Sequence, residues 1–307
     1  MLEQLVPMLL TSAKAPPPET GRWAYEVKWD GFRVLTRTGP AGLRVWSRRG
    51  TDFSAAFPEL GDLPRALDHR AALLDGELVS FESLGRTSFG RIRRRWGPSA
   101  RRKALQLSRE CPATLVVFDV LELDGHRVTA APYEERRGLL ASLRLGDRHW
   151  LETQFHVGDG VALLKASREQ RLEGLVAKRL GSPYRPGIRS PDWQKLKNYE
   201  RETFVIGGWI PDGAGRLEAL LVGRLDGDRL AYCGSVEFGL DGQRRQLAEL
   251  LTLIATPDSP FGRGRQTGKV RYVLPRLTAR VRFIGWDGPV LREAIFERAA
   301  VADCSGG

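Results

Sequence analysis

The sequence predicts an α+β protein built from two domains, residues 1–198 and 199–307. A length of 307 residues suits one large or two medium domains. A composition of 42% hydrophobic and 28% charged residues is typical of a globular protein that buries real cores. Near residue 199 the pattern changes from strands mixed with helices to strands separated by Gly and Asp turns.

The first domain, expected to hold antiparallel sheets with helices, is organised around the charged stretch from Tyr25 to Arg33. Residues 1–22 before it are expected to form an irregular arm. Alternation predicts a strand with Glu26 and Lys28 on one face, and Asp30-Gly31 predicts a hairpin turn into a second strand. In isolation this stretch is better explained as an exposed hairpin with solvated charges. The rest of the chain favours a chemical role.

Two carboxylates interrupt an apolar strand from Ala71 to Glu82, namely Asp75 and Glu77. Carboxylates in such surroundings are costly unless they are paired, hydrogen-bonded or bound to a cation. The alternative is that Asp75-Gly76 forms a plain hairpin turn.

A run of basic residues without an acid extends from Arg91 to Lys103. The like charges repel, and an anionic partner would relieve them. The net charge of +11 also favours a polyanion, nucleic acid first and an acidic membrane surface second. The run is therefore either a phosphate contact, through Arg93, Arg94 and Arg95, or a mobile basic loop.

The remaining elements of the first domain follow from periodicity. Strands are expected at 43–50, 114–121, 172–179 and 192–197, and helices at 57–67 (broken by two prolines), 132–145 and 158–170. The second domain is expected to contain strands at 204–210, 217–225 and 229–236, a helix at 241–254, and strands at 270–274 and 279–286. Three strands, a helix and two strands is the order of a five-stranded OB barrel, with a generic antiparallel β domain as the alternative.

Several classes of protein are disfavoured. No apolar run approaches the roughly 20 residues that span a bilayer, and residues 1–10 lack the basic start of a signal peptide. The cysteines Cys111, Cys233 and Cys304 are too far apart for a disulfide framework or a zinc quartet. A reducing cytoplasm is the default compartment.

Six stretches resemble, in family order, the motifs of the covalent nucleotidyltransferases, and specifically of the ATP-dependent DNA ligases. They are Lys28–Arg33 (K-x-D-G-x-R), Ser47–Gly50, Asp75–Glu77 (D-G-E), Phe118–Asp119, Glu173–Lys178 (E-G-[LIV]-V-x-K) and Trp193–Lys197 (W-x-K-x-K). The likeness extends over nearly the whole chain and is greatest to the ligase domain of bacterial multifunctional end-joining ligases. It implies a nucleotidyltransferase (adenylation) domain followed by an OB barrel.

The resemblance implies a mechanism in which Lys28 attacks the α-phosphorus of ATP and becomes adenylylated. AMP then passes to the 5′-phosphate of a nick, and the 3′-hydroxyl expels it. The implied nucleotide-binding residues are Glu26, Arg33, Glu77, Phe118, Lys178, Lys195 and Lys197, with Phe118 on the adenine and Arg33 and Glu77 on the ribose. Glu173 and Asp75 would bind Mg²⁺ or Mn²⁺, and Arg48, Arg49, Arg93, Arg94 and Arg95 would contact DNA. Neighbouring cations are expected to lower the pKa of Lys28 toward roughly 7–8.

One motif of the family is missing. The OB domain of the family ends with R-x-D-K, which orients pyrophosphate, and residues 296–303 do not reproduce it. Self-adenylylation is therefore expected to be slow, or another basic residue serves.

The expected partner is nicked duplex DNA, with Ku or other end-joining repair proteins as further candidates. A chain of 307 residues lacks room for the polymerase and phosphoesterase domains of the larger proteins, so we expect a stand-alone, monomeric ligase in the bacterial cytoplasm, associated with the nucleoid. The alternatives are an RNA ligase, a capping-type nucleotidyltransferase, or a non-catalytic nucleic-acid-binding protein.

Overall fold

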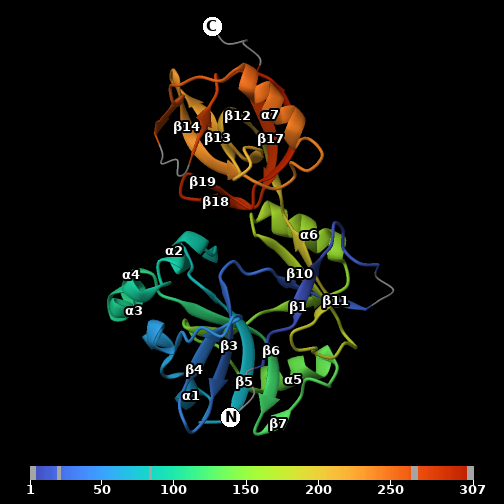
Figure 1. The fold of residues 1–307 in the computed structure, drawn as a ribbon. Coiled ribbons are helices and arrows are strands. Elements are labelled where there is room, and N and C mark those ends of the chain that lie inside the picture. The colour runs from blue at the N-terminus through green and yellow to red at the C-terminus, as the bar shows by residue number, and fades with distance from the viewer. Residues whose placement is uncertain (1–4, 19–21, 83–84, 264–268, 303–307) are drawn as a thin grey trace. The chain divides into compact units, whose positions relative to one another are not determined.

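The computed structural model describes residues 5–18, 22–82, 85–263 and 269–302. It divides into two compact units, Met1–Asn198 and Tyr199–Gly307 (Figure 1). Each unit has a hydrophobic core of its own. Among the described residues, no helix is long and apolar enough to cross a membrane.

The first unit contains two sheets. The first has the strand order β1-β11-β10-β2-β9, with bounds β1 (Leu9–Ser12), β2 (Trp23–Val27), β9 (Phe155–Val157), β10 (Gly174–Arg179) and β11 (Arg189–Lys197). The second has the order β4-β3-β5-β6-β7, with β8 on β6, and its bounds are β3 (Phe32–Thr38), β4 (Arg44–Ser47), β5 (Ala72–Val79), β6 (Thr114–Leu123), β7 (His126–Arg127) and β8 (Trp150–Glu152). A shared apolar cluster, including Leu35 of β3 and Trp193 of β11, joins the two sheets.

The stretch around Lys28 is not a hairpin, which corrects the sequence prediction. β2 and β3 belong to different sheets, and residues 28–31 carry the chain from one sheet to the other. Alternation defines which residues share a face, but it cannot say which strand is the partner. At the crossing, a Cβ on Gly31 would lie 2.0 Å from the carbonyl oxygen of Leu78, so only glycine fits.

Other differences in the first unit are local. β5 runs unbroken through Asp75 and Glu77, so the hairpin-turn alternative is wrong. The N-terminal arm is not wholly irregular, because β1 pairs with β11 in parallel.

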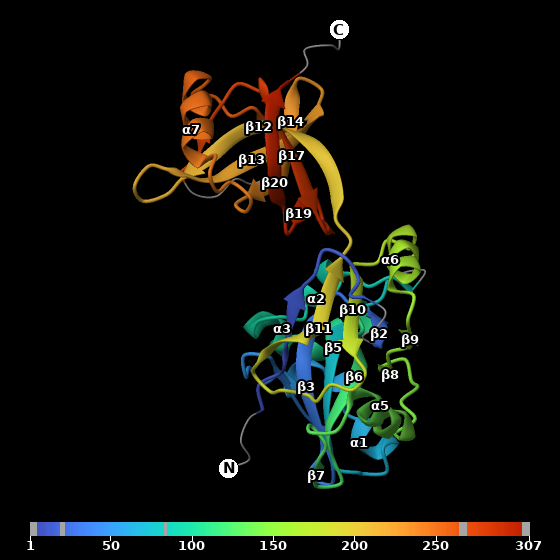
Figure 2. The same ribbon diagram turned by 90° about the vertical axis from the view of Figure 1, so that its right-hand side faces the viewer.

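The helices of the first unit lie around the two sheets (Figure 2). Short helical turns cover the six-stranded sheet: η2 (Ser54–Ala56), η3 (Pro58–Leu60), α1 (Leu63–Ala66), α2 (Phe89–Arg93), α3 (Pro98–Arg102) and α4 (Ala104–Glu110). The basic run therefore forms two short helices instead of a loop. Helix α5 (Tyr133–Ser142) packs against β6, and α6 (Gly160–Glu169) packs against β10 and β2.

The second unit is an OB-type barrel with one helix. Its strands are β12 (Glu200–Pro211), β13 (Leu217–Asp226), β14 (Arg229–Val236), β15 (Phe261–Arg263), β16 (Arg271–Tyr272), β17 (Leu277–Phe283), β18 (Gly285–Asp287), β19 (Val290–Arg292) and β20 (Ile295–Val301), and its helix is α7 (Arg244–Leu253). The main strand order is β14-β13-β12-β17-β20, and a bridge between Phe238 and Ile295 joins its two ends. The predicted OB barrel with three strands before its helix is confirmed, but six described strands follow the helix where two were predicted.

The identity of the last barrel strand differs from the prediction. The stretch 270–274 contributes only the two-residue β16, and the final strand is β20, which pairs with β17. β20 contains most of the stretch where R-x-D-K was expected, and Arg298 lies opposite Arg280 of β17. Asp303, at the end of that stretch, and Cys304 lie outside the described residues.

Candidate active site

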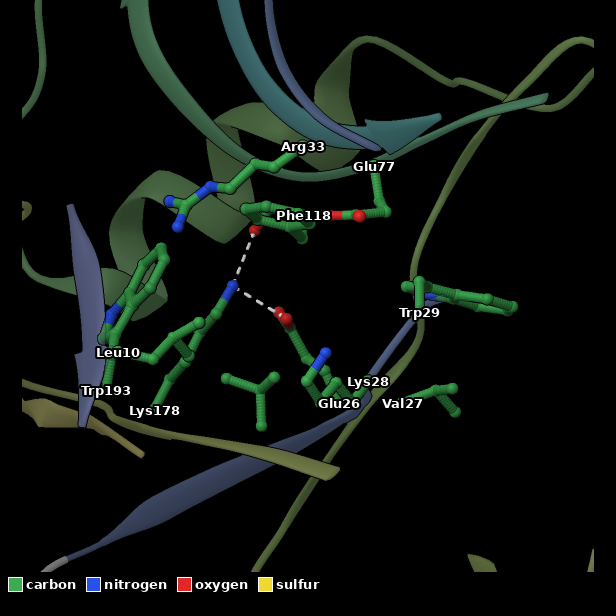
Figure 3. Close-up of a pocket in the computed structure, with 11 residues that line it drawn as sticks. Leu10, Glu26, Val27, Lys28, Trp29, Arg33, Glu77, Phe118, Lys178 and Trp193 are labelled. Atoms are coloured by element: carbon green, nitrogen blue, oxygen red, sulfur yellow. Dashed lines mark hydrogen bonds and ion pairs between the residues drawn. The ribbon is translucent and has the colours of Figure 1, made fainter. Parts of the chain in front are cut away.

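A pocket in the first unit is lined by residues from both sheets (Figure 3). Its lining comprises Leu10, Glu26, Val27, Lys28, Trp29, Arg33, Glu77, Phe118, Val176, Lys178 and Trp193. Arg33, Glu77 and Phe118 come from the six-stranded sheet, whereas Glu26, Lys178 and Trp193 come from the five-stranded sheet. The pocket therefore brings together the first, third, fourth, fifth and sixth of the predicted motifs.

Lys28 lies where the chain crosses between the sheets. Its Nζ is 2.8 Å from a carboxylate oxygen of Glu173, and its side chain is 19% exposed. Burial lowers the pKa of Lys28, but the carboxylates of Glu173, Glu77 and Asp30 outweigh burial and raise the pKa above its ordinary value. The expectation of a lowered pKa is wrong for this state of the protein, because the nearest charges are acidic.

Glu173 is held close to Lys28 by the backbone. It precedes β10, where Gly174 accepts a hydrogen bond from the Lys28 amide (2.9 Å). Gly174 has a φ of +149°, and a Cβ there would lie 1.9 Å from the Leu196 carbonyl oxygen. Glycine after the glutamate thus allows β10 and β11 to approach each other next to the lysine.

One end of the pocket combines aromatic rings with a buried ion pair. The Nζ of Lys178 lies 2.7 Å from Glu26 and 4.4 Å and 4.2 Å from the ring centroids of Phe118 and Trp193. It also donates to the Phe118 carbonyl (3.3 Å). Burial lowers the pKa of Lys178, although Glu26 opposes the shift. This end offers ring faces, an acceptor and a donor to a flat heterocycle.

Asp75 is not placed to bind a metal, which corrects the sequence prediction. It is fully buried, and its two oxygens accept hydrogen bonds from Arg33 at 3.0 and 2.6 Å. The hydroxyl of Tyr184 donates to the same carboxylate at 2.6 Å. Asp75 therefore orients Arg33, which lies opposite Glu77 on the adjacent strand.

Lys195 and Lys197 extend the same wall of the pocket. They follow Trp193 by two and four residues on β11 and so share a face with it. Lys195 lies opposite Val176, and Lys197 lies opposite Gly174, with its Nζ 3.9 Å from Glu173. The wall leads from the aromatic end of the pocket to Lys28 and Glu173.

Comparison with known proteins identifies the family. A model described as ATP dependent DNA ligase domain matches residues 7–197, and one described as ATP dependent DNA ligase C terminal region matches residues 213–300. The chain belongs to the ATP-dependent DNA ligase family. Its first unit is the adenylation domain of that family, and its second is the OB-fold region.

Individual relatives agree with this ligase assignment. The multifunctional non-homologous end joining DNA repair protein LigD of Mycobacterium tuberculosis is 33% identical over 291 residues, which cover 92% of this chain and 37% of LigD. DNA ligase C1 of Mycolicibacterium smegmatis is 32% identical over 256 residues, 80% of this chain and 72% of that protein. A solved mycobacterial DNA ligase D, complexed with ATP and MES, has a TM-score of 0.60 and 31% identity, covering 96% of this chain and 95% of that one. This chain thus spans little more than a third of the length of LigD.

The predicted DNA-binding arginines differ in their exposure. Arg48 and Arg49 are exposed beyond the end of β4, and Arg93 is exposed at the end of α2. Arg95 is buried, where it pairs with Glu59 at 2.6 Å, so its assignment to DNA is corrected. Arg94 is half-exposed but is paired with Glu110 at 2.7 Å.

Sequence reasoning missed the support that helix α5 gives to the pocket. Tyr133 and Arg137 are buried there and contact Glu26, at 2.5 Å and 3.8 Å respectively. The signal was present, because Tyr133 and Arg137 are four residues apart and so share a helix face.

We predict that Glu77→Gln stabilises the folded protein at pH 8. Burial raises the pKa of Glu77 from 4.5 to about 8, against the opposing effect of Lys28 and Arg33. As the pH rises from 4.5 to 8, Glu77 ionises first in the unfolded chain, so the wild-type free energy of unfolding falls across this window. The variant lacks this loss, and we expect its Tm to exceed that of the wild type by about 2–4 °C at pH 8.

The measurement is thermal unfolding of both proteins at pH 5 and pH 8. The advantage of the variant should shrink at pH 5, whereas Glu82→Gln, at an exposed site, should change neither value. An equal difference at both pH values would argue against a raised pKa.

Proposed function

We propose that this chain seals nicks in duplex DNA with ATP, through a covalent AMP on Lys28. The observation that carries the proposal is the ion pair between Lys28 and Glu173, 2.8 Å apart beside a pocket suited to a nucleotide. The position of Lys28 between the two sheets gives it access to a phosphate while its neighbours bind the rest of the nucleotide. The ATP complex of mycobacterial DNA ligase D supports the same nucleotide.

The pocket suits ATP in one orientation. Phe118 and Trp193 supply ring faces for adenine, and Glu26 and Lys178 offer an acceptor and a donor to its edge. Arg33 and Glu77, opposite each other on β3 and β5, are proposed to bind the ribose. Lys195 and Lys197 then lie toward the phosphates, where they balance charge as it moves to the leaving group.

A divalent cation, Mg²⁺ or Mn²⁺, fits this site through Glu173. Among the described residues no three His, Cys, Asp or Glu side chains form a metal-binding cluster. Mg²⁺ does not require one, since it is commonly held by one or two carboxylates together with substrate phosphates and water. Bound there, the cation would supply positive charge to the phosphates. The chain's own contribution is to hold Glu173 beside Lys28.

Within this chain, Lys28 must lose a proton before it attacks the α-phosphorus. Its N–P bond forms as the bond from the α-phosphorus to pyrophosphate breaks. AMP is then transferred to the 5′-phosphate of the nick, and the 3′-hydroxyl displaces AMP to form the phosphodiester. Positioning and charge balance carry most of the catalysis in such phosphoryl transfers.

The physiological substrate is proposed to be a DNA break in repair. The names of the LigD relatives associate them with non-homologous end joining. We extend this role to the present chain, with Ku or other end-joining proteins as candidate partners. The net charge of +11 supports a non-specific grip on duplex phosphates.

Replacement of both Arg48 and Arg49 by Glu is predicted to weaken nick binding and to flatten its salt dependence. Each neutralised phosphate contributes about 0.9 to the slope of log affinity against log salt, so loss of two contacts lowers the slope by about 2. The measurement is nick affinity between 50 and 200 mM salt, by fluorescence anisotropy. Arg65→Glu, the same type of replacement at one exposed site on α1, is the control and should leave the slope unchanged.

The experiment that tests the proposed function uses α-labelled ATP with Mg²⁺ or Mn²⁺, followed by a denaturing gel. Label on the protein that is lost on adding nicked DNA supports a DNA ligase. A pre-adenylylated nick tested in parallel shows whether the altered R-x-D-K stretch limits only the first step. Label released by nicked RNA but not by nicked DNA would instead favour an RNA ligase. The absence of both labelling and sealing would contradict the proposal.

A further inference from the structure

Two buried tyrosines stand behind the nucleotide pocket without lining it. The hydroxyl of Tyr133 donates to Oε1 of Glu26 at 2.5 Å, and the hydroxyl of Tyr184 donates to Oδ2 of Asp75 at 2.6 Å. Both rings are almost wholly buried. Each tyrosine therefore supports a different buried carboxylate, and each carboxylate in turn contacts a cationic residue of the pocket, Lys178 or Arg33.

Helix α5 fixes Tyr133 by bonds to both sheets. The amide of Tyr133 donates to the Leu180 carbonyl, at the end of β10 (2.9 Å). On the same helix, Arg136 forms a double hydrogen bond with Asp119 of β6, at 2.8 Å for each oxygen. Arg137 donates to the carbonyls of Phe118 and Thr153, at 3.2 and 2.6 Å. The helix thereby holds Glu26 and Phe118, from opposite sheets, in a fixed relation.

We propose that Tyr133 is a positioning residue that sets the preference for adenine through Glu26, whereas Tyr184 positions Arg33 and has no part in reading the base. This inference rests on the proposed function, since it assumes that the pocket binds ATP. Neither tyrosine lines the pocket, so neither is placed to contact the reacting atoms directly.

The contacts of Glu26 explain why Tyr133 matters. Oε2 of Glu26 faces Lys178, and Oε1 faces Tyr133, with Arg137 more distant at 3.8 Å. A carboxylate has about four lone-pair positions, so Glu26 can still accept from the 6-amino group of adenine. Without the tyrosine hydroxyl, Lys178 is its one close partner among the contacts that the structure gives for this carboxylate. Glu26 can then turn with Lys178 and lose its alignment with the amino group.

The experiment compares ATP with purine riboside 5′-triphosphate, which lacks the 6-amino group, in lysyl-AMP formation. We expect Tyr133→Phe to reduce the preference for ATP, as the ratio of kcat/KM values, by about tenfold, which is the scale of one hydrogen bond to a charged group. The change should appear in KM for ATP, with kcat nearly unchanged. Tyr184→Phe is the matched control, and it should raise KM for both nucleotides alike.

The outcomes separate this inference from the proposed function. If the wild type forms no lysyl-AMP, both fail. If the wild type is active but Tyr133→Phe keeps the full preference for ATP, or if both variants change the ratio equally, the positioning inference alone is overturned. Thermal unfolding checks that each variant folds, and Glu26→Gln provides a second route, because it weakens the same contact from its other side and should also reduce the ratio.

Discussion

Lys28→Arg abolishes the transfer of label from α-labelled ATP to the protein. Arginine retains the positive charge that pairs with Glu173, so the fold and the local field change little. Its guanidinium stays protonated at every accessible pH and offers no lone pair for attack. We expect a loss of at least about 10⁴-fold, the scale on which enzymes lose activity when a nucleophile is removed. The measurement is the rate of lysyl-AMP formation on a denaturing gel.

Two controls distinguish loss of the nucleophile from a general defect. Lys165→Arg alters an exposed lysine on α6 and should label like the wild type. The Lys28→Arg protein should still seal a pre-adenylylated nick, because that substrate bypasses the attack by lysine. Persistent labelling of Lys28→Arg would mean that another residue is the nucleophile.

The sequence predicted the types of element better than it predicted their partners. Alternation around Lys28 was interpreted as a hairpin, yet β2 and β3 lie in different sheets. Local pattern describes faces, whereas pairing depends on long-range packing that no short window contains. The last barrel strand was missed for a related reason, since Ile295–Val301 has no strict alternation and carries Glu297 and Arg298 at its centre.

The residues of the candidate site could be predicted where a sequence motif contains them. The role of a residue could not be predicted where it depends on whether its side chain is buried. Glu26, Lys28, Arg33, Glu77, Phe118 and Lys178 do line one pocket. The family resemblance implied that Asp75 binds a metal, but of the two carboxylates in its motif the structure directs Glu77 to the pocket and buries Asp75 against Arg33. Likewise the basic run looked uniform, although Arg95 points inward to Glu59, 36 residues earlier in the chain. A charge run reveals nothing about which of its members is buried.

Glu173 is predicted to control how the reaction depends on pH. Burial lowers the pKa of Lys28, but Glu173, Glu77 and Asp30 together raise it by more than burial lowers it. Little of the amine is therefore neutral near pH 7. Below that pKa, each added pH unit increases the neutral fraction about tenfold, and the rate of lysyl-AMP formation should rise in parallel without a plateau up to about pH 9. Raising the Mg²⁺ concentration should move the profile to lower pH, because a cation near Glu173 competes with the Lys28 ammonium for the carboxylate.

Glu173→Gln separates the two effects of this carboxylate. Without its charge, the pKa of Lys28 should fall, so the pH profile should bend at lower pH than in the wild type. The maximal rate should nevertheless drop by about 10²-fold or more, and Mg²⁺ should no longer shift the profile, since the proposed oxygen ligand is weakened. Rates measured from pH 6 to 9 at two Mg²⁺ concentrations test both effects, with the exposed Glu169→Gln as control. A wild-type plateau near pH 7 at low Mg²⁺, or an unchanged profile in Glu173→Gln, would show that this glutamate does not govern the protonation of Lys28.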